Sequence, residues 1–273
     1  LVYRDRLGIK PLYFFKNENS FVFSSNLNSI RNHIKSSEKS KLNFILFLLL
    51  NYFPSNKTVY ENIQKLKPGE FIKIENNKFT LNKYWEVNKI KKENLKKDEI
   101  NYNIQKLIEN SVEINLRSDV KVGTLLSGGI DSSIISYEAS KHLKEQNTFC
   151  VNFKNKKNNE GNDAKKFSQF INSKHKNLDL EIEDFFHTLE HISKISDEPH
   201  ADSSIVPSFL ISKEAKNKNV KVLISGAGGD EIFAGYKRHY SSFRNLFFGI
   251  LNNVGFLDDK LIKIFPHKIK NYL

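Results

Sequence analysis

The chain has 273 residues, a formal net charge of +12 and a pI near 9.4, with 39% hydrophobic and 27% charged residues. This composition is typical of a folded protein and excludes disorder and collagen-like fibres. The longest apolar run, 44–50, is too short to span a bilayer, and no secretory signal is visible at the start. The single cysteine excludes a disulfide framework. We therefore expect a cytoplasmic protein of about two domains.

Two further features concern what the chain binds and how complete it is. Lysine is spread over the whole sequence rather than gathered beside a recognisable nucleic-acid-binding module, so we interpret the positive charge as a bias in composition. Neither nucleic acid nor a membrane is expected as a partner. Because the sequence begins with Leu1 and contains no methionine, we expect a fragment of a longer protein.

The first 85 residues are predicted to mix short strands and helices. The run 41–52 is apolar enough for a buried core helix, and Pro54 follows its end. Pro68-Gly69 marks a turn, and Asn76-Asn77 lies at the tip of a predicted hairpin. The predicted elements are strands over 12–15 and 21–23, helices over 26–34 and 41–52, and strands over 70–75 and 79–84.

After a lysine-rich linker over 86–97, the pattern changes to alternating helices and strands. Asp98 is a candidate cap for a helix whose apolar stripe continues to Leu116. Such alternation predicts a parallel sheet covered by helices on both faces. The predicted strands are 120–126, 148–153 and 220–224, and helices are expected over 132–143 and 205–215 and around 164–171 and 185–192.

A glycine turn lies between the strand predicted over 120–126 and the next helix, in the sequence Leu-Leu-Ser-Gly-Gly-Ile-Asp-Ser-Ser at 125–133. Glycines there let a backbone approach an anion, and the start of a helix favours phosphate. Asp131 fits such a site if magnesium bridges the carboxylate to phosphate. The alternative is a structural turn in which Asp131 and Ser132 cap the helix.

A second glycine turn, Ser-Gly-Ala-Gly-Gly-Asp-Glu at 225–231, also follows a predicted strand. In an open parallel sheet both turns lie at the carboxyl edge, where ligands bind. Asp131 and Asp230 are therefore predicted to face one magnesium–pyrophosphate unit. Lys237 and Arg238 follow and are candidates to offset phosphate charge.

These motifs resemble, in their order, the glutamine-hydrolysing asparagine synthetases over essentially the whole chain. The first turn resembles the pyrophosphate loop of enzymes that split ATP between the α and β phosphates. The matching segments are 4–13, 66–69 and 84–85 for the glutaminase domain, and 117–133, 197–199, 202–204 and 225–236 for the synthetase domain.

The resemblance implies an α/β fold in which a partial N-terminal-nucleophile (αββα) glutaminase domain precedes a Rossmann-like parallel-sheet ATP-pyrophosphatase domain. The domains would span 1–85 and 98–273 on either side of the linker. It implies a ligase that amidates aspartate to asparagine with glutamine-derived ammonia. The reaction passes through an aspartyl-adenylate and releases AMP and pyrophosphate. Expected ligands are ATP, magnesium, aspartate and glutamine or ammonia, and a homodimer is left open.

The family's site residues transfer to matching positions of this chain. Asp131 and Asp230 would be the catalytic, magnesium-binding carboxylates. The glutaminase nucleophile lies at the family's mature N-terminus and has no counterpart here, so this chain alone is not expected to be active. By resemblance, the residues that bind ATP or pyrophosphate are Leu125, Ser127, Gly128, Gly129, Asp131, Ser132, Val151, Ser225 and Gly226.

The residue at position 227 leaves more than one candidate for the carboxylate that is amidated. Some relatives carry an acidic residue there that helps at the reaction centre, and alanine cannot do acid–base work. A related enzyme that amidates another carboxylate, such as a sugar uronate, or that closes a β-lactam ring, is therefore a second hypothesis. An RNA-modifying ATP-pyrophosphatase is a third. The net charge motivates it, and the glutaminase-like first part argues against it.

Other signals are interpreted as structural. His187, Glu190 and His191 match an inverted zinc-protease pattern, but they are predicted to lie on a solvated helix face opposite the stripe of Phe185, Leu189 and Ile192. In the same way, Cys150 is predicted to be buried and inert and His200 to lie in a loop, and Trp85, Phe14-Phe15 and Phe247-Phe248 are predicted to pack in the core or between domains.

Overall fold

The computed structural model describes residues 1–35, 37–76, 78–153, 160–236 and 239. The chain divides into two compact units. The first comprises Leu1–Leu107, Val151–Lys157 and Leu178–Lys218, and the second comprises Ile108–Cys150, Asn158–Asn177 and Asn219–Leu273. The units do not follow chain order, because the first combines the N-terminal part with a segment from the later half.

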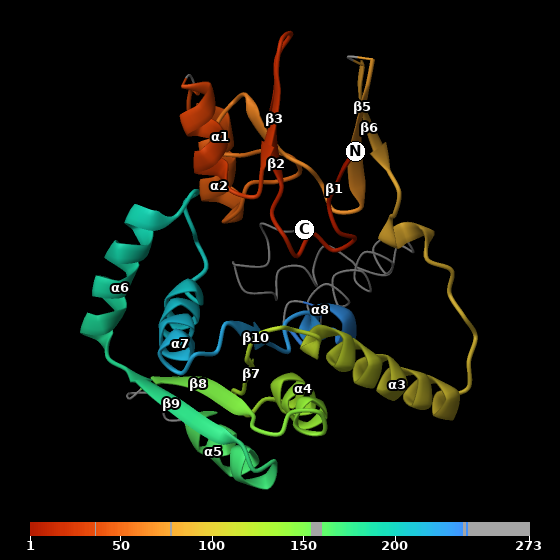
Figure 1. Ribbon diagram of the computed structural model, residues 1–273, viewed down its shortest axis with the longest axis vertical. Helices are drawn as coiled ribbons and strands as arrows, with labels where there is room; N and C mark the ends of the chain where they lie inside the picture. The colour runs from red at the N-terminus through yellow and green to blue at the C-terminus, as the bar shows by residue number, and fades with distance from the viewer. Residues whose placement is uncertain (36, 77, 154–159, 237–238, 240–273) are drawn as a thin grey trace, which may run out of the picture. The chain divides into compact units, whose positions relative to one another are not determined.

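The first unit contains two three-stranded antiparallel sheets (Figure 1). The strands predicted in this part form, and the Asn76 end of the expected hairpin has a left-handed φ of 48°. Asn77 lies outside the described residues. One sheet has the order β1 (Val2–Tyr3), β5 (Glu70–Glu75), β6 (Lys78–Lys83), and the other has the order β3 (Phe21–Ser24), β2 (Tyr13–Lys16), β4 (Ile63–Lys65).

Helix α1 (Leu27–Ile34) anchors the main core of this unit. It begins after Asn26, whose side chain accepts a hydrogen bond from the Ser29 amide at 2.8 Å, as an N-cap does. Leu27 and Ile30 are completely buried. Their cluster also includes Tyr13, Phe47, Phe53, Val59, Tyr60 and Ile63.

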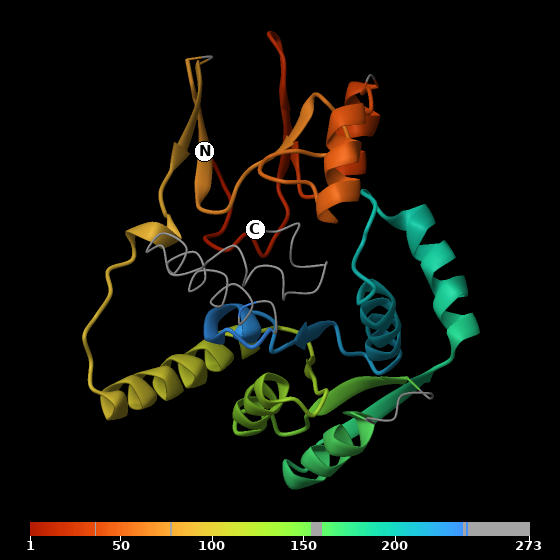
Figure 2. The same cartoon turned by 180° about the vertical axis from the view of Figure 1, so that it is seen from behind.

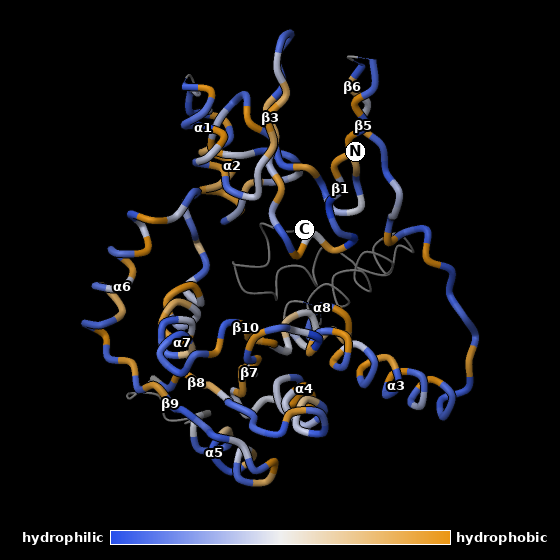
Figure 3. The backbone as a smooth tube through the Cα atoms, in the orientation of Figure 1, coloured by the Kyte–Doolittle hydropathy of each residue, from blue (hydrophilic) through white to orange (hydrophobic). Residues whose placement is uncertain are grey.

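The prediction of a buried helix over 41–52 is wrong in its burial. Helix α2 (Lys41–Leu50) does form, but among its residues only Asn43 and Phe47 are buried. Leu48 and Leu49 are 61% and 73% exposed. The helix is apolar nearly all round (Figure 3), so its sequence does not identify the one side that packs on the core.

Helices α6 (Ile182–Ile195) and α7 (Ile205–Asn217) belong to the first unit, whereas α3 (Lys97–Leu116) crosses the division between the units after Leu107. Helix α3 starts one residue before Asp98, so that carboxylate lies in the first helical turn and is not the cap that was predicted. Helices α6 and α7 lie side by side in Figures 1 and 2. Within the predicted linker, η1 (Val87–Lys89) is a single 3-10 turn, and residues 90–96 form no helix or strand.

The second unit is built on the parallel sheet that alternation predicted. The strand order is β10 (Val222–Ile224), β7 (Val122–Leu125), β8 (Asn147–Phe153), β9 (Lys174–Leu180). β10 runs parallel to β7 with Val222 opposite Val122, and β7 runs parallel to β8 with Gly123 opposite Asn147. The division between the units passes through β8 and β9.

Among the described residues, the second unit contains the end of α3 together with α4 (Ile130–Ser140), α5 (Glu160–Phe170) and the short α8 (Gly229–Phe233). β9 and α8 were not predicted. β9 carries the sequence Lys-His-Lys-Asn-Leu-Asp-Leu, whose polar residues hide a strand from hydropathy. In the part of the chain that the structure describes, no helix combines the length and apolar character needed to cross a bilayer.

Candidate functional site

The first glycine turn joins β7 to α4, as predicted, and two serines close it. The Ser127 amide donates to the Ser132 hydroxyl at 3.2 Å, and the two hydroxyl oxygens lie 3.0 Å apart. The Ser132 hydroxyl donates to the Gly129 carbonyl at 3.1 Å, and the Gly129 amide donates to Ser127 Oγ at 3.4 Å. The turn is therefore held in one shape by its own hydroxyl groups.

The glycines of this turn serve different needs. Gly128 has a φ of +84°, and a Cβ there would lie 2.9 Å from the Ala164 backbone nitrogen, so only glycine fits. Gly129 is the N-cap of α4 and makes no side-chain cap. Because the first amides of a helix lack intrahelical partners, this end of α4 is suited to an anion.

The second glycine turn joins β10 to α8. The Gly229 amide donates to the Gly226 carbonyl at 3.1 Å, and the Ala227 amide donates to Ser225 Oγ at 3.3 Å. Gly228 caps α8 with a φ of +99°, a conformation that favours glycine. Residues 225–229 thus form a second compact turn directly after a strand.

The two turns touch each other at Asp131. A Cβ on Gly226 would lie 2.9 Å from the carbonyl carbon and Cβ of Asp131, and 2.9 Å from the Ser132 nitrogen. A Cβ on Gly229 would lie 2.6 Å from Cγ of Asp131 and 2.7 Å from one carboxylate oxygen. This contact follows from the topology, because β7 and β10 are parallel neighbours and their carboxyl ends share one edge of the sheet.

Asp230 lies in the first turn of α8, next in sequence to the glycine that contacts the Asp131 carboxylate. Its own carboxylate oxygen lies against Gly235, where a Cβ would overlap it, and the Gly235 amide donates to the Asp230 carbonyl at 3.0 Å. Asp131 and Asp230 are both half-buried. Lys237 and Arg238 fall outside the described residues.

A buried polar network behind the first turn was missed by sequence reasoning. The Thr124 hydroxyl lies 3.0 Å from Ser136 Oγ, and Gln146 Nε2 donates to Thr124 Oγ1 and to the Ser136 carbonyl, both at 3.0 Å. All three residues are buried. The network fixes α4 against β7 and therefore fixes the turn between them. The unusual threonine inside the apolar strand was the signal available in the sequence.

The remaining predicted nucleotide residues occupy the two strands. Leu125 ends β7 and is half-buried. Val151 is assigned to the first unit, where it packs against the cluster of Leu180, Ile192 and Val206. Its role at the nucleotide stays a prediction.

The signals interpreted as structural are mostly confirmed. Cys150 is 3% exposed, and His200 lies in an exposed loop segment. On α6, Glu190 pairs with Lys194 at 2.7 Å, and both side chains are exposed, as the predicted solvated face requires. The prediction of a buried stripe on α6 is partly wrong, because Ile192 is buried but Leu189 is 37% exposed. Across the described ranges, no three histidine, cysteine, aspartate or glutamate side chains gather into a possible metal site. Phe247 and Phe248 lie beyond the described residues.

Comparisons with known proteins find a matching family model for each half of the chain. The family model described as asparagine synthase matches residues 103–266, and the glutamine amidotransferase domain model matches residues 1–85. A Methanocaldococcus jannaschii protein provisionally named glutamine-hydrolysing asparagine synthetase 2 is 34% identical over 248 residues, covering 88% of this chain and 48% of that protein. Glutamine-hydrolysing asparagine synthetase 1 of Bacillus subtilis is 31% identical, covering 85% of this chain and 37% of that protein.

Among solved structures, an NH3-dependent NAD synthetase from Campylobacter jejuni aligns with a TM-score of 0.33 and 21% identity, covering 52% of this chain and 61% of that one. That likeness is too low to carry an argument about this chain. The chain spans about half or less of the length of the two curated relatives named above. Because the asparagine synthase model matches more than half of its residues, the chain belongs to the asparagine synthase family.

Proposed function

We propose that the protein carrying this sequence makes asparagine from aspartate, ATP and glutamine-derived ammonia. An oxygen of the aspartate side-chain carboxylate attacks the α-phosphorus of ATP, and pyrophosphate leaves. Ammonia then attacks the acyl carbon of the aspartyl-adenylate, and AMP leaves. The observation that carries the proposal is the contact of two glycine turns at the carboxyl ends of neighbouring parallel strands, around one carboxylate. We place the reaction in the cytoplasm.

The residues of the first turn suit the leaving pyrophosphate. The uncapped start of α4 offers backbone amides and the positive end of the helix dipole to phosphate oxygens. Ser127 and Ser132 add hydroxyl groups, and Gly128 and Gly129 keep side chains away from the anion. Such donors are already oriented before charge develops on the leaving group, which lowers the barrier.

The second turn and the strand residues would bind the rest of the nucleotide. Ser225 and Gly226 follow β10, and Gly226 lies against the first turn, which supports assigning them contacts with the nucleotide. We assign Leu125 and Val151 to apolar contacts with the nucleotide. The domains proposed for these roles are 1–85 for the glutaminase part and 98–273 for the synthetase part, joined by 86–97.

The carboxylates present fit a magnesium ion. Magnesium in phosphate-transferring sites takes one or two carboxylates and completes its shell with phosphate and water. Asp131 and Asp230 supply that number, and Gly229 lets the Asp131 carboxylate lie close to the start of α8, which carries Asp230. When bound there, magnesium would neutralise charge on the phosphate oxygens.

The acceptor has a second candidate. Ala227 is exposed at the second turn and brings neither charge nor a titratable group. If the acceptor carboxylate were not aspartate, a sugar uronate amidated through the same adenylate chemistry would fit the other residues equally well.

The test is pyrophosphate release by the full-length natural protein that carries this sequence, with ATP, magnesium and ammonia, in the presence and absence of aspartate. Aspartate-dependent release is expected. Release that needs no aspartate in a folded, ATP-binding enzyme would favour another carboxylate. Asp131→Asn is expected to abolish release, because an amide holds neither metal nor charge as a carboxylate does. Asp184→Asn, which changes an exposed aspartate in the first turn of α6, is the matched control.

A further inference from the structure

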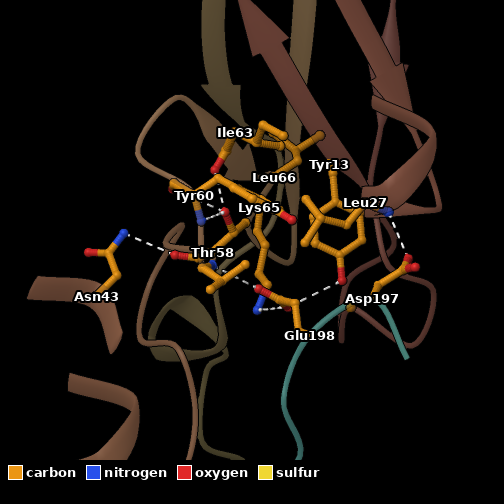
Figure 4. Close-up of polar contacts among 12 residues, drawn as sticks. Tyr13, Leu27, Asn43, Thr58, Tyr60, Ile63, Lys65, Leu66, Asp197 and Glu198 are labelled. Atoms are coloured by element: carbon orange, nitrogen blue, oxygen red, sulfur yellow. Dashed lines mark hydrogen bonds and ion pairs between the residues drawn. The ribbon is translucent and has the colours of Figure 1, made fainter. Parts of the chain in front are cut away.

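Two neighbouring carboxylates, Asp197 and Glu198, connect distant parts of the first unit (Figure 4). They lie between α6 and α7, in the stretch matched by the asparagine synthase model. Among the described residues, their side-chain hydrogen-bond and ion-pair partners lie between residues 13 and 65, in the stretch matched by the glutamine amidotransferase model. We call Asp197 and Glu198 the acidic pair.

Asp197 binds the N-terminus of α1. The Leu27 amide donates to one carboxylate oxygen at 2.8 Å, and Asn28 Nδ2 donates to the other at 2.6 Å. The first amides of a helix have no intrahelical acceptor, and a negative charge is favourable at this end of the helix dipole. Asp197, in the synthase-like stretch, therefore provides a hydrogen-bond acceptor and a negative charge at the N-terminus of α1.

Glu198 contacts three separate points of the amidotransferase-like stretch. Lys65 Nζ lies 2.8 Å from Oε2, the Val59 amide donates to Oε1 at 3.3 Å, and the Tyr13 hydroxyl donates to Oε2 at 3.5 Å. The Glu198 side chain is 12% exposed and that of Lys65 is 20% exposed. Charges this little exposed depend on each other, because the charge left behind is only partly hydrated when its partner is lost.

The Glu198–Lys65 ion pair differs from the Glu190–Lys194 pair of α6 in burial and in the distance along the chain that it spans. Glu190 of α6 also pairs with a lysine at 2.7 Å, but both side chains are about two-thirds exposed and belong to the same helix. Exposed pairs of this kind contribute little. Glu198 instead joins residues 133 positions apart in the chain, since its partner is Lys65, and Val59 and Tyr13 belong to the main core cluster.

We propose that the acidic pair docks the amidotransferase-like stretch against the synthase-like stretch and so positions the two for transfer of ammonia. This inference rests on the proposed function. After Glu198 the chain runs through α7 and β10 into the second glycine turn, so the docked segment is covalently continuous with the nucleotide site. Loosening the contact lets ammonia made from glutamine escape, whereas ammonia supplied in solution still reaches the adenylate. Asp197 and Glu198 are thus positioning residues.

The experiment uses Glu198→Gln and Asp197→Asn in the full-length protein, with Glu190→Gln as the matched control. Two quantities are measured: amide formed per glutamine hydrolysed, and the rate with saturating ammonia. We expect the first to fall about fivefold or more in both variants, a usual size for coupling between sites, while the second stays near the wild-type rate. The control is expected to change neither. Lys65→Met combined with Glu198→Gln is expected to lose no more coupling than Glu198→Gln alone, because both changes remove one interaction.

Two results would overturn the proposal. One is an unchanged yield of amide per glutamine in both variants. The other is an equal fall of the glutamine-driven and ammonia-driven rates, which indicates a general loss of stability. Hydrogen exchange at the Leu27 and Val59 amides distinguishes failure of the docking proposal from failure of the proposed function. If the wild type releases no pyrophosphate, faster exchange in the variants still supports docking, and unchanged exchange refutes it.

Discussion

Replacing Gly226 with alanine is expected to separate the two glycine turns. The added Cβ would lie 2.9 Å from two carbons of Asp131 and from the Ser132 nitrogen. That is roughly 0.6 Å short of an ordinary carbon–carbon contact of about 3.5 Å. Two of the three atoms belong to the backbone, so rotation of a side chain cannot relieve the overlap and the turns themselves have to move.

The size of the effect follows from that displacement. Overpacking of this kind costs about 1–3 kcal/mol of unfolding free energy. A shift approaching 1 Å between a binding group and its substrate can cost about 100-fold in rate. We therefore expect Gly226→Ala to lower pyrophosphate release by between one and two orders of magnitude and to destabilise the fold measurably.

The assay is pyrophosphate release by the full-length protein at saturating ATP, aspartate and ammonia, together with urea unfolding. Gly129→Ala is the stability control, because its Cβ would meet nothing closer than Ser127 Oγ at 3.5 Å. It is expected to cost at most about 1 kcal/mol, because alanine is a poorer N-cap than glycine but meets no steric overlap. A Gly226→Ala variant with wild-type rate and stability would refute the contact between the turns.

Three further predictions concern stability. Thr124→Val removes the hydroxyl at the centre of the buried network and is expected to cost about 1–3 kcal/mol in urea unfolding; no change would mean that the network is not formed. On α2, Leu49→Gln should change stability by less than about 0.5 kcal/mol, whereas Phe47→Ala should cost about 3–5 kcal/mol; similar losses would mean that both faces are covered. Burial holds the pKa of His175 below its ordinary value. The unfolded chain therefore binds this proton more tightly, stability should fall as the pH drops below about 6.5, and His175→Gln should flatten that fall; an equally steep fall in the variant would contradict it.

The sequence predicted most of the elements because local signals were strong. Asn26 and its following apolar residues marked α1, and the alternation over 70–75 marked a strand of the hairpin. The parallel sheet followed from alternating strands and helices, since parallel strands need a crossover between them. Both glycine turns were located because glycine, serine and aspartate have few reasons to cluster at the end of a buried strand.

The errors came from tertiary context, which no local pattern contains. The sequence of α2, with leucine on every side, does not show which side packs on the core. In the structure that side carries Phe47 and Asn43, and the Asn43 side-chain amide donates to the Thr58 carbonyl at 3.0 Å. β9 is recognisable only from its place beside β8, because its lysines and asparagine carry no strand signal. Contacts of Asp197 and Glu198 could not be predicted from spacing, because they join stretches far apart in the chain.

The contact of Asp197 with a residue far earlier in the chain has a consequence for folding during synthesis. The hydrogen bond from the Leu27 amide to Asp197 spans 170 positions. At a synthesis rate of about 5–20 residues per second, α1 leads that carboxylate by about 10–30 s during translation. An eight-residue helix is marginal alone, so in this interval the aromatic strands beside it are poorly protected against pairing with other chains. The stretch that contains α1 is therefore expected to complete its fold only after the segment that carries Asp197 has been synthesised.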